Sequence, residues 1–431
     1  MEIIIVGAGI AGLSAGIALR RAGHIVTILE QSALLQETGA AISIAPNASP
    51  VLRSWGFDIA QSRMVAIKTG SILNGSNMQM MVPNYYANIE ENYGAPIYAV
   101  HRVDLHDQLK ALATGDDGPG QPCKLHVRAT VADYVSPTPA KLVFSRDVAD
   151  HFRQDPLHAM VTTADGTVWQ ADLVIAANGV HSTARDHVLV TDESHASDTG
   201  WSTMRWLVPT QELLADPATA SLVEDSTQRY FVGARGGGLS FESENVTEGM
   251  YTPLEPTMVM DYAKKEFSPA LQAVLAKATD VRFWKLVARN PLSSWRKDSL
   301  VLIGDAAHPM LPFQAQGGAQ AIEDAAVLGI LLDQVQDKAT LDMRLGLFEN
   351  IRRGRGSAIQ TLSNSGPPMP QSVRDAAAQF LPEGTSLQSQ DDVIDVIFSH
   401  DVVGKTKEIL EASVSGQDYK SNVTQFGGTK L

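Results

Sequence analysis

The chain is poor in cysteine, since Cys123 is the only one. A single thiol can form no internal disulfide bond and cannot build a cysteine-based metal cluster. None of His101, His181 and His308 has the spacing of a metal site either, so we expect no bound metal.

Basic residues are scarce relative to acidic ones. The chain has 34 lysine and arginine residues against 48 acidic residues, and its formal net charge is -14 at pH 7. An acidic surface repels a phosphate backbone, so nucleic acid is not an expected partner.

Long apolar runs are missing as well. No stretch approaches the roughly 20 apolar residues that a membrane-spanning helix needs. Met1 leads almost directly into the first apolar strand pattern, which leaves no room for a signal peptide. We therefore expect a cytoplasmic protein with no membrane partner. The final residues Thr429-Lys430-Leu431 resemble the Ser-Lys-Leu peroxisomal address, so a peroxisomal location is the alternative.

Glycine, in contrast, is concentrated near the start, where the sequence runs Gly7-Ala8-Gly9-Ile10-Ala11-Gly12. The β-branched run 3–6 before it is typical of a buried parallel strand, and apolar residues at helical spacing follow over 10–21. In such a unit Gly7 permits the tight turn, Gly9 lets the backbone approach a pyrophosphate, and Gly12 allows close packing of helix and strand. The helix N-terminus attracts the phosphate charge.

A second apolar strand pattern, 25–29, delivers Glu30 roughly 20 residues beyond the last glycine of this motif. An acidic side chain at that spacing can accept hydrogen bonds from a ribose diol. Its charge also repels a 2′-phosphate, so the site suits FAD or NAD and not NADP.

A further motif follows the apolar run 299–303 and reads Gly304-Asp305-Ala306-Ala307-His308-Pro309. The Asp305 carboxylate is expected at the end of a buried strand, where it can accept hydrogen bonds from ribitol. Gly317 and Gly318 then precede a helical apolar pattern over 319–332. The N-terminus of that helix would stabilise negative charge on a reduced isoalloxazine ring.

With these motifs the chain resembles the class A flavoprotein aromatic monooxygenases, closest to the salicylate hydroxylase type and its relatives in fungal secondary metabolism. The resemblance covers roughly residues 1 to 365. It also rests on three further motifs in the family's order, Gly39-Ala40-Ala41-Ile42 with Pro46-Asn47-Ala48, His101-Arg102-Val103-Asp104-Leu105, and Ala177-Asn178-Gly179-Val180-His181-Ser182 with Arg185.

The resemblance implies an α/β fold in which a Rossmann-type FAD-binding domain of the p-hydroxybenzoate hydroxylase type is interleaved with a smaller α+β substrate domain on a mostly antiparallel sheet. It implies FAD, held non-covalently because no His or Cys stands in a flavinylation context, and NADH or NADPH as co-substrate. Arg102 would contact the FAD, and Asp305 and Gly318 would line the ribityl and flavin site. Ala41, Asn178 and Gly317 belong to the same cofactor motifs.

The resemblance further implies that NAD(P)H and O2 serve to insert one oxygen atom into an aromatic, phenolic small molecule through a C4a-hydroperoxyflavin. Secondary metabolism and aromatic catabolism both suit that reaction. Two alternatives stay open: an FAD-dependent dehydrogenase or oxidase, and a flavin-binding protein with little turnover. The residues also leave open the substrate, the choice between NADH and NADPH, and whether the protein is a monomer or a homodimer.

Asn178 departs from the family motif, which has Asp-Gly where this chain has Asn178-Gly179. Asn keeps hydrogen-bonding capacity but loses a charge. In the family this loop serves both the FAD pyrophosphate and the reduced nicotinamide. The change therefore bears on flavin reduction more than on FAD binding, unless Asn occupies the same turn without consequence.

The length of 431 residues suggests two domains. We expect the FAD-binding domain to take 1–70, 97–190 and 285–365, and the substrate domain to take 71–96 and 191–284. Residues 366–431 would form a C-terminal helical extension and tail, with a helix over 402–412.

The substrate domain offers one candidate catalytic residue, Arg205. The segment Met204-Arg205-Trp206 resembles the family's pocket strand, whose arginine can hold a phenolate or carboxylate. The alternative is a surface arginine on an edge strand. The Tyr-Pro pair that related fungal enzymes often carry is missing from 231–242, so the pocket wall is altered.

Three histidines, His101, His181 and His308, fall inside the cofactor motifs. That position is more typical of structural hydrogen-bonding residues than of general bases. His181 and Ser182 form no credible nucleophilic pair without a third orienting group, so no catalytic triad is expected.

Overall fold

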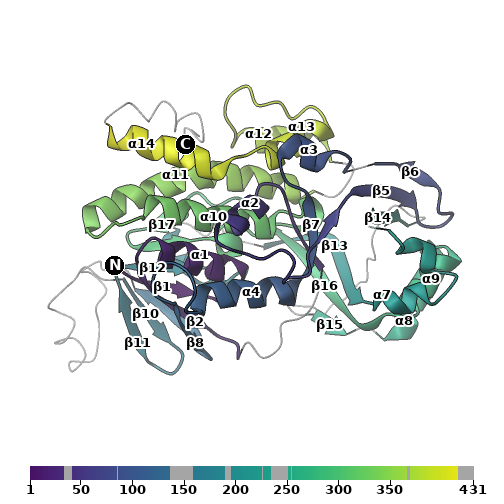
Figure 1. The fold of residues 1–431 in the computed structure, drawn as a ribbon, viewed down its shortest axis with the longest axis horizontal. Helices are drawn as coiled ribbons and strands as arrows, with labels where there is room; N and C mark the ends of the chain where they lie inside the picture. The colour runs from purple at the N-terminus through teal and green to yellow at the C-terminus, as the bar shows by residue number, and fades with distance from the viewer. Residues whose placement is uncertain are drawn as a thin grey trace.

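The computed structural model of the protein describes residues 1–33, 41–84, 86–135, 159–189, 196–225, 227–233, 251–253, 255–365 and 369–415. These residues form a larger body, which contains the N-terminus and the last described helix, and a smaller body beside it (Figure 1). The predicted targeting sequence at 429–431 and residues 39–40 of the third motif lie outside the described residues.

A six-stranded sheet forms the centre of the larger body. Its order is β17-β18-β12-β1-β2-β8, and every neighbouring pair is parallel except β17 with β18. The strands are β1 (Glu2–Val6), β2 (Ile25–Glu30), β8 (Lys124–Val127), β12 (Leu173–Ala176), β17 (Arg296–Lys297) and β18 (Leu300–Leu302). The strands predicted at 3–6, 25–29 and 299–303 are confirmed.

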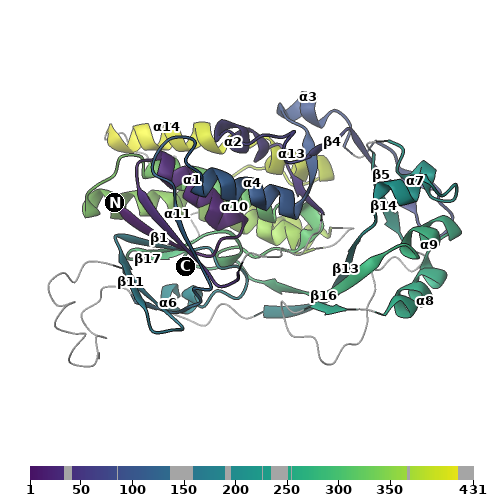
Figure 2. The same ribbon diagram turned by 60° about the horizontal axis from the view of Figure 1, so that its bottom comes forward.

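Helices cover this sheet, with α1, α4 and α10 grouped beside it in Figure 2. The main helices of the larger body are α1 (Ile10–Arg21), α4 (Arg102–Thr114), α10 (Gly317–Leu331) and α11 (Lys338–Ser363). Helices α1 and α10 approach each other closely, because a Cβ at Gly329 would lie 2.8 Å from the Ala18 Cβ. The helices predicted over 10–21 and 319–332 are therefore confirmed, and α10 begins two residues earlier than the apolar pattern.

Two three-stranded antiparallel sheets extend the larger body, one ordered β11-β10-β9 and the other β3-β7-β4. The strands are β3 (Ala41–Ile44), β4 (Val65–Ile67), β7 (Ile97–His101), β9 (Val131–Val135), β10 (Ala159–Thr163) and β11 (Val168–Ala171). Short helices α2 (Ser49–Ser54), α3 (Ile89–Tyr93), α6 (Ala184–Val188), η2 (Gly304–Ala306) and η3 (Pro312–Gln314) connect these elements.

The smaller body holds two more sheets, β13-β16-β15, which is antiparallel, and β14-β5-β6. The elements are β5 (Thr69–Asn74), β6 (Met80–Val82), β13 (Ala196–Leu207), β14 (Thr227–Val232), β15 (Tyr251–Pro253), β16 (Thr279–Arg289), α7 (Thr210–Leu214), α8 (Pro256–Glu266), α9 (Pro269–Leu275) and η1 (Ala220–Leu222). Its apolar centre is separate and contains Val259, Ala263, Leu275 and Val281.

The predicted fold class is confirmed by this arrangement of helices and sheets. Strand β5 pairs in parallel with β14, so segments far apart in the sequence meet in the smaller body. That pairing favours interleaved domains, although the individual boundaries at 70, 97, 190, 285 and 365 stay predictions.

Three helices follow α11: α12 (Gln371–Ala378), α13 (Gln390–Phe398) and α14 (Val402–Val414). The helix predicted over 402–412 is confirmed. Helix α12 lies within the predicted helical extension, but its bounds were not predicted, because apolar periodicity fades there and only Ala377 of the helix is buried. Among the described helices, none has the length and apolar composition that crossing a bilayer requires.

A buried group of four charged side chains joins α10 to α11, and we call it the ion cluster. It consists of Glu323 and Asp324 from α10 with Arg352 and Arg355 from α11. Arg352 donates Nη1 to Glu323 Oε2 at 2.6 Å and Nε to Asp324 Oδ1 at 2.8 Å. Arg355 donates Nε to Glu323 Oε2 at 2.8 Å. Two negative charges thus face two positive charges inside the protein.

The ion cluster also holds segments outside the two helices. Asp324 Oδ2 accepts hydrogen bonds from the Gly304 N–H at 2.9 Å and from His308 Nε2 at 2.7 Å. Glu323 Oε1 accepts one from Asn47 Nδ2 at 2.6 Å. The cluster therefore fixes the loop that carries Asp305 and the segment that follows β3.

Both carboxyl groups of the ion cluster have lowered pKa values. Burial by itself raises the pKa of Glu323, but Arg355 and Arg352 outweigh burial and hold the pKa below its ordinary 4.5. Burial by itself also raises the pKa of Asp324, but His308 and Arg352 outweigh burial and hold this pKa below its ordinary 3.8. A carboxyl whose pKa is lower in the folded chain stabilises the fold above its ordinary pKa, and that stabilisation is lost as the pH falls.

Replacing Arg352 by Met should lower the free energy of unfolding at pH 7 by about 3–5 kcal/mol, because two buried carboxylates lose a partner. The penalty should shrink as the pH falls toward 4, since carboxyl groups that are buried without this partner take up protons more readily than in the unfolded chain. Denaturant unfolding of the wild type and the variant at several pH values measures both effects.

Arg353→Met is the matched control, because Arg353 is the next residue of α11 and is partly exposed. It should change the free energy of unfolding little. Equal losses in the two variants, or a penalty for Arg352→Met that grows on acidification, would contradict the stabilising role of the ion cluster.

Candidate cofactor and active site

The glycine turn between β1 and α1 is crowded on one side and open on the other. Gly7 has a φ of +104°, and a Cβ there would lie 2.6 Å from the Ala177 carbonyl oxygen. A Cβ at Gly12 would lie 1.9 Å from the Gly7 carbonyl oxygen, whereas a Cβ at Gly9 would meet nothing within 4 Å. Gly7 and Gly12 are required by the turn itself, and Gly9 borders free space.

Helix α1 begins at this turn without a side chain to cap it. Gly9 is the N-cap residue, and the first turn contains no acidic residue. The first N–H groups of a helix have no acceptor within the helix, and they form the positive end of its dipole. Together with the open space at Gly9, this arrangement fits the diphosphate of a dinucleotide.

Glu30, the last residue of β2, is held against the same turn. Its Oε2 accepts a hydrogen bond from the Ala8 N–H at 2.8 Å, and its Oε1 accepts one from the Ser32 N–H at 2.7 Å. Carboxylate oxygens can accept more than one hydrogen bond each. Glu30 is partly exposed, so it can also accept from a ribose diol, and that role stays a prediction.

The loop after β18 packs directly on α1, because a Cβ at Gly304 would lie 2.7 Å from the Ala11 Cβ. This contact places Asp305 near the N-terminus of α1. A Cβ at Gly317 would lie 4.0 Å from Asp305 Oδ1, and a Cβ at Gly318 would lie 3.2 Å from Ile42 Cδ1. The N-termini of α1 and α10, the strand β3 and Asp305 therefore converge.

Asp305 is exposed to solvent although protein surrounds it closely. That enclosure raises the pKa of Asp305 by desolvation, and the charges of His308, Arg102 and Arg185 act against the shift. An accessible carboxyl near two guanidinium groups can accept hydrogen bonds from a ligand rich in hydroxyl groups. Asp305 and Arg102, which were predicted from separate motifs, lie close enough for their charges to interact.

Arg185 connects two of the cofactor loops. Its Nη1 donates to the Ala306 carbonyl oxygen at 3.3 Å and to that of Asp305 at 3.5 Å, and its Nη2 donates to the Val180 carbonyl oxygen. The side chain is 4% exposed. Arg185 therefore keeps the loop that contains Asn178 next to the loop that contains Asp305.

Ala41 lies opposite the residue that precedes Arg102. Ala41 is the first residue of β3, and its partner in β7 is His101. Arg102 follows His101 directly and is the first residue of α4. Ala41 is exposed to solvent.

Asn178 follows β12 and lies beside the glycine turn, since a Cβ at Gly7 would lie 3.0 Å from the Asn178 Cα. Its Nδ2 donates to Tyr134 Oη at 3.0 Å. Burial raises the pKa of Tyr134, so the phenol stays neutral. The Asn178 Oδ1 is buried and has no hydrogen-bond partner within the described part of the chain. A bound ligand can supply that missing donor.

Arg205 lies in β13, in the smaller body, opposite Arg282 of β16. The pairing is irregular between Arg205 and Leu207. The structure describes the backbone of Arg205 but not its side chain, so its proposed contact with substrate stays a prediction. Of the altered pocket segment, 231–233 belong to the end of β14 and the residue after it, and 234–242 lie outside the described residues.

Sequence reasoning missed the buried residues whose hydrogen bonds hold the loop of Asp305 in place. His308 was expected to be structural, and its 0% exposure and its hydrogen bond to Asp324 confirm this. Its partner Asp324 was not identified, nor were Glu323, Arg352 and Arg355. The available signal was the pair Glu323-Asp324 inside an otherwise apolar helix, because charges in such a position are buried only when they are paired.

Comparisons with known proteins agree with this geometry. Residues 1–361 match the family described as FAD binding domain. The FAD-dependent monooxygenase phomE′ of Diaporthe leptostromiformis is 50% identical over 419 residues, which cover 93% of this chain and 100% of that protein.

Two solved structures have the same fold at low identity. CtdE in complex with FAD and a substrate has a TM-score of 0.73 at 22% identity, and the match covers 97% of this chain and 100% of that chain. A salicylate hydroxylase substrate complex has a TM-score of 0.61 at 20% identity, covering 100% and 99%. The family match covers most of this chain, and a relative shares half of its residues. This chain therefore belongs to the FAD-dependent monooxygenases of the class A aromatic type.

Proposed function

We propose that the protein uses NADH or NADPH and O2 to insert one oxygen atom into an aromatic, phenolic small molecule. The observation that supports this proposal best is the convergence of the cofactor residues, namely the open turn at Gly9, Asp305, Arg102, and Gly317 with Gly318. The fungal relative favours a role in secondary metabolism over aromatic catabolism.

FAD, when bound, supplies the hydride acceptor and the oxygen-activating chemistry. The residues of the chain bind and orient it. The N-terminus of α1 would hold the diphosphate, Glu30 the ribose diol, and Asp305 the hydroxyl groups of the ribityl chain. No covalent link is expected, because no His or Cys stands in a flavinylation context.

The N-terminus of α10 would stabilise negative charge beside Gly317 and Gly318, since its first N–H groups have no acceptor within the helix. Helix α10 is 15 residues long and has no side-chain cap at its N-terminus. The positive charge of Arg102 adds to the same effect. The chain therefore offers electrostatic stabilisation at the flavin without a catalytic triad.

Asn178 would accept a hydrogen bond from the cofactor or the nicotinamide through its Oδ1, which Tyr134 orients by accepting from Nδ2. An amide performs this role without the charge of a carboxylate. We therefore expect FAD to bind normally, and we expect the missing charge to act on reduction by the nicotinamide.

The substrate must be held in one orientation while water is kept away from the reacting atoms. Arg205 is the residue that we propose for the first task. A guanidinium in the pocket would hold a phenolate or carboxylate by paired hydrogen bonds and would lower the pKa of a phenol.

Oxygen insertion is tested by incubating the FAD-loaded protein with NADH or NADPH under ¹⁸O2, in the presence of phenolic acids, phenols and indoles. A product that is heavier by one labelled oxygen atom is expected, and mass spectrometry detects it. Label that enters from H2¹⁸O instead, or oxidation of substrate without labelled oxygen, would identify a dehydrogenase or oxidase.

Asp305→Ala should weaken FAD binding by about 10- to 150-fold, because the ribityl hydroxyl groups lose a charged acceptor worth roughly 1.5 to 3 kcal/mol. Fluorescence titration of the apoprotein with FAD measures the affinity. Asp333→Ala is the matched control, since Asp333 is an exposed residue just past the opposite end of α10. An unchanged affinity in Asp305→Ala would remove Asp305 from the cofactor site.

Arg205→Ala should keep its FAD content but lose about 10- to 150-fold in product formation, the range expected for a hydrogen-bonded charged group. NAD(P)H oxidation that remains should yield hydrogen peroxide. Arg205→Lys should recover only part of the coupling, which is the amount of product formed per NAD(P)H oxidised. The reason is that an ammonium keeps the charge without the planar donor geometry. Product and peroxide are measured per NAD(P)H consumed.

Arg229→Ala is the control for Arg205→Ala. Arg229 lies on β14 in the same body, and its Nη2 pairs with Asp225 Oδ2 at 2.8 Å. It should leave coupling unchanged. Normal coupling and normal substrate affinity in Arg205→Ala would make Arg205 a surface residue of the strand.

A further inference from the structure

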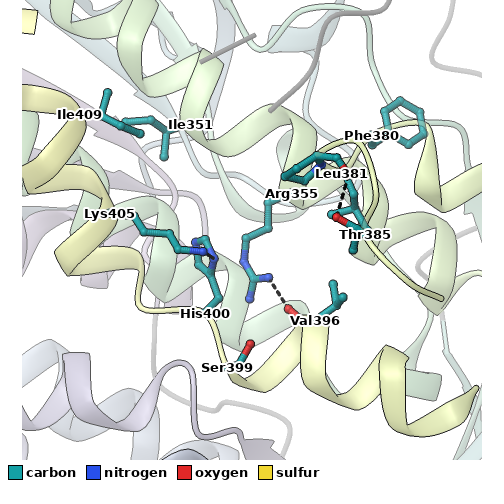
Figure 3. Close-up of a pocket in the computed structure, with 11 residues that line it drawn as sticks. Ile351, Arg355, Phe380, Leu381, Thr385, Val396, Ser399, His400, Lys405 and Ile409 are labelled. Carbon is teal, nitrogen blue, oxygen red and sulfur yellow. Dashed lines mark hydrogen bonds between the residues drawn. The ribbon is translucent and has the colours of Figure 1, made fainter. Parts of the chain in front are cut away.

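A cavity of about 170 Å³ lies where α11 meets the C-terminal helices (Figure 3). Its walls come from α11, from the segment after α12, from the end of α13 and from α14. None of the predicted cofactor residues lines it. The proposed monooxygenase reaction gives this cavity no role.

One part of the cavity wall is apolar. It consists of Ile351, Phe380, Leu381, Pro382, Val396 and Ile409. A space lined in this way favours the apolar part of a ligand over water. At about 170 Å³ it is much larger than the roughly 10–15 Å³ that one water molecule needs, so an organic molecule of several heavy atoms fits.

The other part of the wall is basic, and the ends of Arg355, His400 and Lys405 point toward one another (Figure 3). Lys405 Nζ lies 3.4 Å from His400 Nδ1. No carboxylate lies within ion-pair distance of Lys405 in the described part of the chain. Lys405 is exposed, so its ammonium is accessible to a ligand.

Arg355 contributes charge to the cavity but has few donors left. It donates to Glu323 through Nε and Nη2, to the Val396 carbonyl oxygen through Nη1, and to the Ile397 carbonyl oxygen through Nη2. Four of its five N–H groups are thus engaged. The direct contacts to a ligand would therefore come from Lys405 and His400.

Burial is the main reason that His400 and Lys405 have lowered pKa values. Burial, together with the charges of Arg355 and Lys405, lowers the pKa of His400 to about 2, while Glu323 acts in the opposite direction. Burial also lowers the pKa of Lys405, with Arg355 adding to the shift and Asp401, Glu408 and Glu323 opposing it. A carboxylate placed beside the Lys405 ammonium would form an ion pair with it and would oppose this shift.

We propose that this cavity binds a small organic monocarboxylate, with the carboxylate beside Lys405 and His400 and the hydrocarbon part against the apolar wall. A carboxylate needs few donors, which matches a lysine and a neutral histidine N–H. Inorganic phosphate has more acceptor oxygens and no apolar part. The mixed wall therefore favours the organic anion.

The test is calorimetric titration of the FAD-loaded full chain with sodium hexanoate, with hexanol and inorganic phosphate as comparison ligands. Hexanoate should bind, and hexanol and phosphate should bind at least tenfold more weakly. The flavin absorption spectrum should not change on hexanoate addition, because none of the predicted cofactor residues lines the cavity. The measurement does not use turnover, so its outcome is independent of the proposed oxygen insertion.

Lys405→Met keeps the length of the side chain and removes its charge, and it should weaken hexanoate binding at least tenfold. Lys407→Met is the matched control, because Lys407 is an exposed lysine of the same helix that does not line the cavity. Its affinity should equal that of the wild type. The proposal is overturned if hexanoate does not bind, if Lys405→Met binds it normally, if both variants lose binding equally, or if phosphate binds as tightly.

Discussion

The pairing of Glu323 and Asp324 with Arg352 and Arg355 is the interaction on which the site depends. Four buried charges are tolerated only because each has a partner of opposite sign, and removing one leaves another without compensation. The carboxylates of this group also accept hydrogen bonds from Gly304, His308 and Asn47. The loop that presents Asp305 is thus held by the carboxylate of Asp324, which is fully buried. On the other side, Arg355 holds the end of α13 through two carbonyl groups.

The cofactor side of the molecule could be predicted from sequence because its features are local. The geometry of one turn explains Gly7, Gly9 and Gly12. The strand before this turn and the helix after it have clear apolar periods. The same holds for the strand before Gly304 and the helix after Gly318. What joins these two local units is the contact of Gly304 with Ala11, which involves residues far apart in the sequence.

The remaining features depend on contacts that no local pattern encodes. The ion cluster requires that α10 and α11 lie side by side, and the hydrogen bond between Asn178 and Tyr134 requires that β9 lie near the end of β12. Helix α12 has too small a buried face to produce a period. For Arg205 the strand could be predicted, but the direction of its side chain depends on the irregular pairing of β13 with β16.

The parallel pairing of β5 with β14 has a consequence for how the chain is made. Strand β5 cannot form this part of the sheet until its partner β14, Thr227–Val232, has been synthesised. More than half of the chain is therefore synthesised before β5 can pair with β14. Strands of the larger body are synthesised after β5 and before β14. Pairings across such sequence separations form slowly. The smaller body also cannot be cut out as one continuous fragment, so its exchange between relatives requires two matched insertions.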